Sequence, residues 1–360
     1  MPGREKSRRP RRAVVIGAGS FGTAMAILLA RAGLRTTLQA RTEEQARQVG
    51  RERENRAYLP GVELPPELKV EPAGSSLERI DLVFLAVPSR ALGEAAAALA
   101  TGGLPPGASL VTLAKGLVPP LGQTPTGVLG EAFGSERVAV IGGPVHASEL
   151  VREGGALVAA SENGELAAGL ARIFTRGGVI CELSDDPTGV ELAGAAKNAA
   201  ALASGATVGQ GLNAAGAAAG HIFLEVWRLA EARGARPDAM IGLAGTGDLV
   251  ATALAPSSRN RQAGQMLAEG VPAAEIPARI GQAVESLESV PLLARALDEA
   301  GVPAPVTGGL AALISGELAL DDWVALVRTT VPPSGPMRFR VRPGFWARVR
   351  ARLVRLFRRP

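Results

Sequence analysis

The sequence has a single cysteine, Cys181, and two histidines, His146 and His221, among its 360 residues. A lone cysteine excludes an internal disulfide framework and is typical of proteins of the reducing cytoplasm. Three residues of these two kinds are also too few to predict a structural zinc site. We therefore expect a cytoplasmic protein without a metal site.

Long apolar runs are missing as well. The basic residues 1–12 precede a strand pattern rather than an apolar segment with a small-residue cleavage site, so we expect no signal peptide. The most apolar later stretch, residues 193–226, includes Lys197, Asn198 and Glu225, which makes it too polar to span a bilayer.

Positive charge is scarce between the two ends of the chain. The formal net charge is +5, but residues 1–12 hold six basic side chains and residues 338–360 hold nine arginines. The segment between them carries 24 basic and 33 acidic residues, so it is net acidic. An acidic body repels the phosphate backbone of DNA and RNA, and we expect no nucleic-acid partner.

Short apolar runs alternate with Ala-rich helical stretches from residue 13 to about residue 185. The expected strands are Ala13–Ile16, Thr36–Ala40, Leu82–Ala86, Ser109–Thr112, Val138–Ile141 and Leu157–Ala160. Apolar strands that alternate with helices are typical of a parallel sheet covered on both faces, which is the doubly wound α/β class. We predict such a domain over residues 13–185, after a disordered basic arm at 1–12.

The pattern changes to helices after Asp185-Asp186-Pro187. Residues 193–206, 213–232 and 286–299 have helical character, with few strand candidates between them. We therefore predict an all-helical substrate domain over residues 186–330, followed by a linker and tail at 331–360.

A glycine-rich turn follows the first expected strand and opens a helix. Gly17 allows the tight turn, Gly19 lets backbone N–H groups approach a pyrophosphate, and Gly22 lets the helix pack closely on the strand. The turn alone is a weak signal in a glycine-rich chain, but its position predicts a Rossmann-type dinucleotide site that includes Ser20 and Phe21.

The end of the second expected strand carries no acidic residue. An NAD site usually places Asp or Glu there for the ribose 2′-hydroxyl, whereas residues 38–42 read Leu-Gln-Ala-Arg-Thr. The planar guanidinium of Arg41 suits a 2′-phosphate, although an ordinary solvated arginine is the alternative. We therefore favour NADP(H) over NAD(H) as the cofactor.

The second half places charged groups among small residues. Lys197 and Asn198 lie in an Ala-rich helix, where desolvation would lower the pKa of the lysine and suit it to proton transfer. Asp248 follows a Gly-rich turn, and Ser258-Arg259-Asn260 comes shortly after it. A carboxylate, a hydroxyl and a guanidinium together suit a small phosphorylated polyol.

These motifs together resemble the NAD(P)-dependent glycerol-3-phosphate dehydrogenases of the bacterial type, over roughly residues 13–328. No single motif decides the resemblance, but their order is highly specific. The matching segments are Gly17–Thr23, Glu54–Gly61, Ala86–Ser89, Lys115-Gly116, Gly143-Pro144, Gly189–Asn198, Gly242–Leu249 and Ser258–Asn260. The resemblance implies a Rossmann-type domain followed by a helical substrate domain, and interconversion of dihydroxyacetone phosphate and glycerol 3-phosphate.

The resemblance also implies a role for each matching residue. Lys197 matches the catalytic lysine that protonates the carbonyl oxygen, and Lys115 matches a second active-site lysine that contacts substrate and cofactor. Asp248 and Thr252 match positions near the reacting hydroxyls. The other implied contacts are Arg259 and Asn260 to the phosphate, Gly143, Asn198 and Ser258 to the rest of the substrate, and Pro88, Ala147, Arg259 and Glu285 to the cofactor.

The chain departs from the family pattern at His146, His221, Leu212 and Ser286. Either histidine is a candidate for catalysis, but a packed or hydrogen-bonded histidine is the favoured interpretation. The retained lysines and Ser-Arg-Asn segment predict that the reaction is retained. The alternatives are a related dehydrogenase of another small hydroxy or keto compound, and a catalytically weak, nucleotide-binding membrane adaptor.

The C-terminal segment 343–359 combines aromatic, aliphatic and arginine residues. On a helical wheel its apolar residues fall within about 120°, with arginines opposite. A basic amphipathic helix of this kind is typical of peripheral binding to a membrane surface. The alternatives are packing on its own subunit, a partner protein, or disorder. We also expect a homodimer, and a role in supplying phospholipid synthesis.

Overall fold

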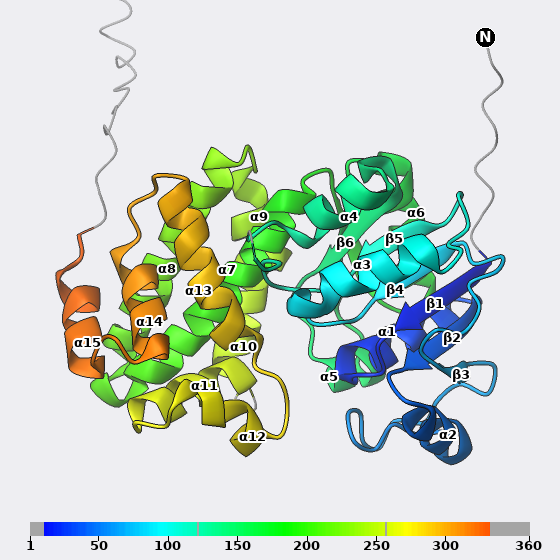
Figure 1. The fold of residues 1–360 in the computed structure, drawn as a ribbon, viewed down its shortest axis with the longest axis horizontal. Helices are drawn as coiled ribbons and strands as arrows, with labels where there is room; N and C mark the ends of the chain where they lie inside the picture. Colours follow the sequence, from blue (N-terminus) through cyan, green and yellow to red (C-terminus); the bar gives the residue numbers. More distant parts are fainter. Residues whose placement is uncertain (1–10, 121, 256–257, 332–360) are drawn as a thin grey trace, which may run out of the picture. The chain divides into compact units, whose positions relative to one another are not determined.

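The computed structural model of the protein describes residues 11–120, 122–255 and 258–331. The described residues up to Thr329 form one compact unit, in which a sheet with its helices is followed along the chain by a helical part (Figure 1). The predicted amphipathic tail lies outside the described residues, as do residues 1–10 of the predicted basic arm. The remaining two residues of that arm are ordered, because the backbone N–H groups of Arg11 and Arg12 donate to Asp81 Oδ2 at 2.7 and 2.9 Å.

An eight-stranded sheet organises the first half of the chain, in the order β3-β2-β1-β4-β5-β6-β7-β8. The strands are β1 (Arg12–Ile16), β2 (Arg35–Ala40), β3 (Lys69–Pro72), β4 (Leu82–Leu85), β5 (Ser109–Thr112), β6 (Val138–Gly142), β7 (Ala156–Ala160) and β8 (Ile180–Ser184). Neighbours pair in parallel except β6 and β7. This arrangement confirms the predicted doubly wound sheet.

Two features of the sheet differ from the prediction. β7 runs antiparallel to β6, because the helix between them has only six residues and spans about 9 Å, too short to return along the sheet. The edge strands β3 and β8 were not predicted, because β3 contains Lys, Glu and Pro and because β8 is exposed along much of its length. Their sequences lack the apolar run that marks a strand buried on both faces.

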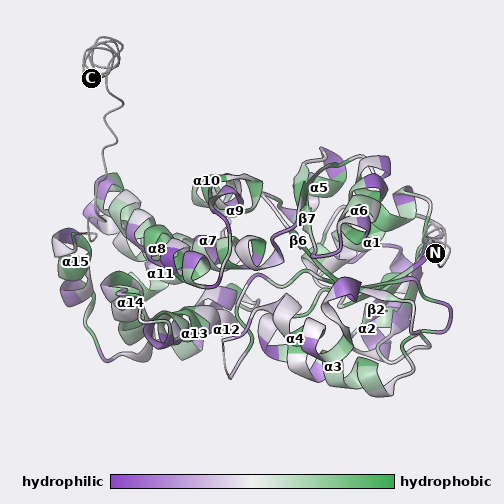
Figure 2. Ribbon diagram, turned by 90° about the horizontal axis from the view of Figure 1, so that it is seen from above, coloured by the Kyte–Doolittle hydropathy of each residue, from purple (hydrophilic) through white to green (hydrophobic). Residues whose placement is uncertain are grey.

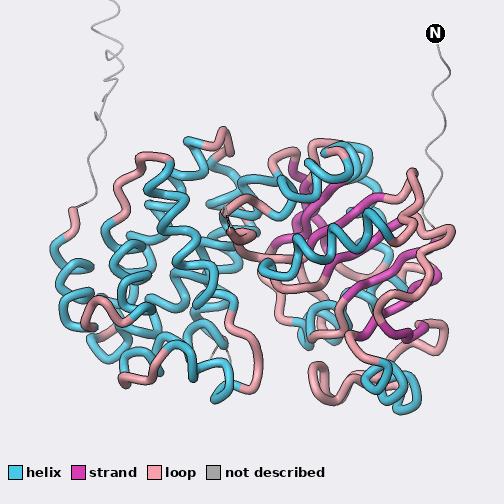
Figure 3. The backbone as a smooth tube through the Cα atoms, viewed as in Figure 1, coloured by secondary structure: helices cyan, strands magenta, loops and turns pink. Residues whose placement is uncertain are grey.

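Helices cover both faces of the sheet (Figure 3). They are α1 (Ser20–Arg31), α2 (Glu43–Glu52), α3 (Leu92–Thr101), α4 (Pro125–Phe133), α5 (Ala147–Arg152) and α6 (Gly164–Arg176). Successive residues of a strand enter different cores, since side chains alternate across a sheet. Val15 and Phe84 pack in one core with residues of α1 and α6, whereas Val14 and Val83 pack in the other with residues of α3 and α4.

The chain is helical from Pro187 onward, and the described residues beyond Ser184 contain no further strand. The helices are α7 (Pro187–Thr207), α8 (Leu212–Ala232), α9 (Pro237–Ile241), α10 (Asp248–Leu254), α11 (Arg259–Ala268), α12 (Ile276–Ile280), α13 (Glu285–Glu299), α14 (Pro305–Ser315) and α15 (Leu320–Thr329). Within the described parts of the chain, no helix is long and apolar enough to cross a membrane.

Helix α7 is the central element of the helical part and is buried along almost its whole length. It packs against α8 and α11, which lie beside it in Figure 2. The crossing of α7 and α11 is very close, because a Cβ atom on Gly205 would stand 2.0 Å from the Arg261 carbonyl oxygen. A Cβ atom on Gly264 would likewise stand 2.0 Å from the Leu202 carbonyl oxygen. The two glycines thus hold the helices at backbone contact distance.

Two buried glutamates cap the N-termini of other helices. Glu191 of α7 accepts hydrogen bonds from the backbone N–H and the hydroxyl of Thr126 in the first turn of α4, at 2.7 and 2.5 Å. Glu225 of α8 does the same for α14, where it accepts from Thr307 N at 2.8 Å and Thr307 Oγ1 at 2.5 Å. Each glutamate satisfies helix N–H groups that have no partner inside their own helix.

The close crossing predicts that Gly264→Ala will lower the free energy of unfolding by about 1–3 kcal/mol, because the added methyl group forces two packed backbones apart. Gly216→Ala is the matched control, since a Cβ atom at this exposed position of α8 would meet nothing within 4 Å. The control should gain up to about 1 kcal/mol from helix propensity. Thermal unfolding measures both effects, and equal Tm values would contradict the packing argument.

Candidate active site

The glycine-rich turn between β1 and α1 is shaped for close backbone approach. A Cβ atom on Gly17, which has φ +113°, would stand 2.4 Å from the Ala86 carbonyl oxygen, and one on Gly22 would stand 2.0 Å from the Gly17 oxygen. Gly19, in contrast, faces open space, and no side chain caps the helix that follows it. The turn therefore fits the pyrophosphate of a dinucleotide, which a helix N-terminus and free N–H groups favour.

Asn55 fixes this turn from the side, and the sequence analysis did not single it out. Its buried amide donates to the Ala18 carbonyl oxygen at 2.9 Å and to Thr23 Oγ1 at 2.8 Å. Ser20 Oγ donates to the Tyr58 carbonyl oxygen at 2.6 Å. The matching segment 54–61 therefore supports the turn, and only its contacts in space reveal this role.

The ends of the parallel strands bring the other predicted cofactor residues to the same edge of the sheet. Pro88 follows β4, Lys115 follows β5, and Ala147 begins α5 after β6. Arg41 follows β2 and is exposed, and its guanidinium has no hydrogen-bond or ion-pair partner among the residues that the structure describes. Ligands of open α/β sheets bind at this edge, so the placement is consistent with the predicted roles.

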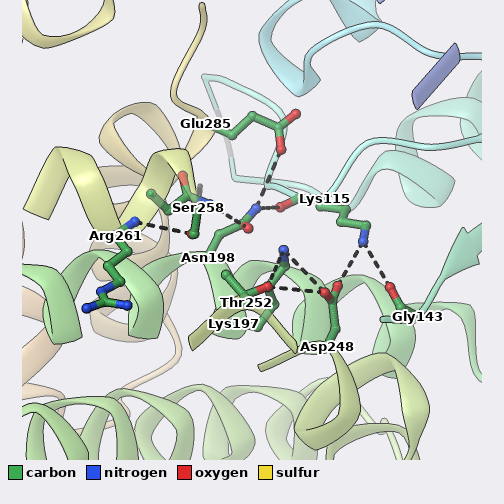
Figure 4. Close-up of polar contacts among 10 residues, drawn as sticks. Lys115, Gly143, Lys197, Asn198, Asp248, Thr252, Ser258, Arg261 and Glu285 are labelled. Atoms are coloured by element: carbon green, nitrogen blue, oxygen red, sulfur yellow. Dashed lines mark hydrogen bonds and ion pairs between the residues drawn. The ribbon is translucent and has the colours of Figure 1, made fainter. Parts of the chain in front are cut away.

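Two lysines share one carboxylate at the centre of the site (Figure 4). Lys115 Nζ lies 2.8 Å from Asp248 Oδ2 and 3.2 Å from the Gly143 carbonyl oxygen. Lys197 Nζ lies 3.4 Å from Asp248 Oδ1 and 3.3 Å from Thr252 Oγ1. The three ionisable groups come from the β5–α4 connection, α7 and α10, so the structure joins residues that are far apart in the sequence.

Burial sets the charge balance of this cluster. It lowers the pKa of Lys197 from 10.5 to about 8, against the attraction of Asp248 and together with the repulsion of Lys115. Burial alone would raise the pKa of Asp248, but the two ammonium groups hold it below its ordinary value. The cluster therefore sets two lysine side chains against a single carboxylate. Lys115 also lies 5.7 Å from the ring centre of Phe21, beside the glycine-rich turn.

Asn198 links this cluster to the other predicted residues (Figure 4). Its amide nitrogen donates to the Lys115 carbonyl oxygen at 3.0 Å and to Glu285 Oε2 at 3.5 Å. Its amide oxygen accepts from Asn260 Nδ2 at 2.8 Å. Asn198 thereby connects α7 to the first residue of α13 and to the first turn of α11, next to Arg259.

Arg259 lies at the start of α11, whose N-cap is Ser258. Its guanidinium is exposed and donates to Gln282 Oε1 and to the Ala283 carbonyl oxygen, both at 3.1 Å. These contacts direct it toward the loop before Glu285. No contact joins it directly to the lysines within the described residues, so the link between them runs through Asn260 and Asn198.

The positions that depart from the family pattern are spread over several elements. His146 is the N-cap residue of α5 without a side-chain cap hydrogen bond, His221 lies on α8, and Leu212 is exposed at the start of α8. Ser286 is fully buried, and its hydroxyl has no hydrogen-bond partner among the described residues.

The sequence is similar to glycerol-3-phosphate dehydrogenases over most of its length. It is 35% identical to glycerol-3-phosphate dehydrogenase [NAD(P)+] of Chelativorans sp., over 85% of this chain and 93% of that protein. It is 38% identical to the enzyme of the same name from Deinococcus radiodurans, over 86% of this chain and 92% of that protein. The family models for NAD-dependent glycerol-3-phosphate dehydrogenase match residues 12–167 (N-terminus) and 186–325 (C-terminus). The chain belongs to this family.

The glycerol-3-phosphate dehydrogenase family is also supported by a solved structure. The crystal structure of glycerol-3-phosphate dehydrogenase from Coxiella burnetii superposes with a TM-score of 0.83 at 30% identity, over 90% of this chain and 100% of that chain. The family resemblance and the predicted fold class are thereby confirmed. The role of each site residue and the predicted domain boundaries stay predictions.

The buried ammonium group of Lys197 predicts a stability effect that depends on pH. The pKa of Lys197 is lowered in the folded state. At neutral pH the charged form of this lysine is therefore less favourable in the folded protein than in the unfolded chain. Lys197→Met should therefore raise Tm at pH 7. As pH rises from about 8 to about 10.5, the folded lysine loses its proton before the unfolded lysine does, so the wild type gains stability and the difference shrinks.

Thermal unfolding of both proteins at pH 7 and at pH 10 measures this effect. Lys69→Met, on the exposed edge strand β3, is the control for the loss of a lysine charge outside the cluster. A lower Tm for Lys197→Met at pH 7, or a difference that grows with pH, would show that the ion pair with Asp248 outweighs burial.

Proposed function

We propose that the protein interconverts dihydroxyacetone phosphate and sn-glycerol 3-phosphate with NAD(P)(H), with NADP(H) favoured over NAD(H). The observation that supports this most is the cluster of Lys115, Asp248 and Lys197 beside the glycine-rich turn. Two ammonium groups held by one carboxylate can bind and protonate an oxygen that gains negative charge during reduction.

Each member of the cluster has a distinct part in the proposed reaction. When bound, the nicotinamide supplies the hydride for reduction and accepts it for oxidation. Lys197 Nζ donates its proton to the substrate carbonyl oxygen, and the lowered pKa of this lysine favours the transfer. Lys115 stabilises the negative charge on that oxygen, and Asp248 holds both ammonium groups in place.

The first turn of α11 is the proposed site for the substrate phosphate. Arg259 is held there by two acceptors from the 282–283 loop, and Asn260 is held by Asn198. The N-terminus of α11 has no acidic residue in its first turn, so its N–H groups and the guanidinium both favour an anion. Asn198 follows Lys197 directly in the sequence. Its hydrogen bond to Asn260 therefore fixes the proposed phosphate site relative to the proposed proton donor.

Lys197→Ala is expected to lower kcat by about 10²–10⁴-fold, because it removes the general acid, while binding of NADPH is retained. Arg259→Ala should mainly raise KM for dihydroxyacetone phosphate, by about ten- to hundred-fold, because it removes a charged phosphate ligand. Steady-state kinetics followed by NADPH absorbance, with Lys69→Ala as control, separate the two effects. Full activity of Lys197→Ala would reject the assignment.

The position of Arg41 predicts the cofactor preference. Arg41→Ala should lower kcat/KM for NADPH about tenfold and leave that for NADH nearly unchanged, because only NADPH has a 2′-phosphate for the guanidinium. Arg35→Ala at the opposite end of β2 is the control. An equal loss with both cofactors would show that Arg41 does not distinguish them.

The alternatives are a dehydrogenase of another small hydroxy or keto compound and a catalytically weak, membrane-associated adaptor. Activity with a different carbonyl compound in a substrate panel would favour the first. NADPH binding without oxidation by any substrate would favour the second. The buried lysine cluster argues against the adaptor. Burying two ammonium groups costs folding free energy, and an adaptor would not use them in catalysis.

We also propose that the enzyme is a cytoplasmic homodimer that supplies glycerol 3-phosphate for phospholipid synthesis. The basic amphipathic pattern of residues 343–359 supports peripheral contact with the inner face of an anionic membrane. Flotation with anionic vesicles, comparing the full chain with one ending at residue 331, tests that contact.

A further inference from the structure

Glu191 is a fully buried carboxyl group that the proposed reaction leaves unused. It lies on α7 six residues before Lys197 and forms no ion pair within the described residues. Burial raises its pKa to about 8, although hydrogen bonds from Thr126 and Thr124 oppose the shift. Glu191 therefore favours its protonated form at neutral pH, as expected for a carboxyl group without a buried cation.

A small cavity lies between Glu191 and the lysine cluster. Lys115, Gly143, Glu191 and Asp248 all line it, and it has room for about one water molecule. Gly194 of α7 also lines the cavity, and a Cβ atom there would stand 3.5 Å from Lys115 Cβ, at ordinary van der Waals distance. The charged groups that line this cavity together with Glu191 are Lys115 and Asp248. On the α4 side, the hydroxyl and the N–H of Thr126 bond Glu191 directly, and Glu131 lies in the adjacent groove.

A second cavity lies next to Thr126, the residue that bonds Glu191. Thr126, whose hydroxyl is 2.5 Å from Glu191 Oε2, also lines a surface groove with Thr188, Glu131 and Glu162. The groove is bounded by α4 and by the start of α7, and the residues of the glycine-rich turn do not line it. Glu191 thus lies between the inner cavity and the surface groove.

We propose that Thr126 and Glu191 form a proton relay that returns a proton from the surface groove to Lys197 after each reduction. The proposal rests on the proposed function, which consumes one proton for each hydride transferred. Lys197 is buried, and bound cofactor and substrate would restrict its contact with solvent further, so a route through the protein would return its proton without waiting for product release. The groove, Thr126, Glu191 and the inner cavity provide that route.

The transfers balance without any further reactant. After Lys197 has protonated the substrate oxygen, the O–H bond of Glu191 breaks, and its proton passes through the cavity water to Asp248. Asp248 passes a proton to the neutral amine of Lys197, which is 3.4 Å away. The Glu191 carboxylate then takes a proton from the Thr126 hydroxyl, which takes one from water in the groove. Oxidation of the alcohol runs the same steps in reverse.

Capping of a helix accounts for only part of this arrangement. Glu225 caps α14 through Thr307 with the same hydroxyl distance of 2.5 Å, yet it lines neither of the two cavities. Glu225 therefore shares the capping role of Glu191 and lacks the route. This pair allows capping and proton transfer to be separated by experiment.

Three variants interrupt or restore the proposed relay. Glu191→Gln keeps the shape and can still bond Thr126, but it carries no exchangeable acid proton. Thr126→Val removes the hydroxyl and keeps the backbone N–H that bonds Glu191, and Thr126→Ser retains a hydroxyl. Glu225→Gln is the matched control for helix capping.

Stopped-flow mixing of each enzyme with NADPH and dihydroxyacetone phosphate, in weak buffer with a pH-indicator dye, follows cofactor oxidation and proton uptake together. Lys197 carries its own proton into the first turnover, so Glu191→Gln and Thr126→Val should complete that turnover at the wild-type rate. Later turnovers should slow at least about tenfold, with proton uptake slowed equally. Thr126→Ser and Glu225→Gln should behave like the wild type.

Wild-type later turnovers in both Glu191→Gln and Thr126→Val would overturn the relay. Equal slowing of first and later turnovers, also seen in Glu225→Gln, would likewise overturn it in favour of a purely structural role. If Glu191→Gln does not fold, Thr126→Val decides, because it keeps the cap on α4 through its N–H group.

Infrared spectroscopy of the enzyme without substrate gives a second readout. The band of a protonated, buried carboxyl group should be present at pH 7 and lost in Glu191→Gln. Its absence from the wild type would overturn the relay. A wild-type enzyme that does not oxidise NADPH with dihydroxyacetone phosphate would instead contradict the proposed function, so the two failures are distinguishable.

Discussion

The buried contact between one carboxylate and two ammonium groups constrains much of the structure. Lys115 and Lys197 both lie within ion-pair distance of Asp248, and all three side chains are largely removed from water. Burying charges costs several kcal/mol for each ion, and removing Asp248 would leave two buried lysines without their shared carboxylate. The three elements that carry these residues must therefore stay in register, and the surplus positive charge remains available for an anion.

The small side chains of helix α7 allow neighbouring elements to pack close to it. It carries Glu191, Lys197 and Asn198 on a helix made mostly of Ala and Gly, so that neighbouring backbones approach closely. Gly205 has no side chain, so α11 packs on α7 at backbone contact distance. The many Ala and Gly residues of α7 carry no obvious motif in the sequence. Their small size nevertheless allows polar groups from distant segments to come together around this helix.

The sequence predicts those parts of the structure that are encoded locally. Apolar runs indicated the central strands, and the spacing of Gly17, Gly19 and Gly22 indicated the turn, because both signals depend on near neighbours. The strands β3 and β8 and the direction of β7 were not predicted, since edge strands need no apolar run and direction depends on how a connection packs.

The candidate site shows the same division between local and distant information. Lys197, Asn198 and Asp248 stand out because charged and polar side chains among small residues are visible in the sequence. Their mutual contacts, the support from Asn55 and the position of Glu191 between two cavities arise only from the packing of distant segments. No local pattern distinguishes Glu191 from Glu225, although the two occupy very different surroundings.

The hydrogen bonds around the glycine-rich turn also make it selective for the sign of a ligand's charge. The Ala18 carbonyl oxygen accepts from Asn55 and Gln45, and the Gly19 oxygen accepts from the hydroxyl and the N–H of Thr23. With these lone pairs engaged by the protein itself, the turn offers mainly donors to an incoming group. The turn therefore favours an anionic group over a cation.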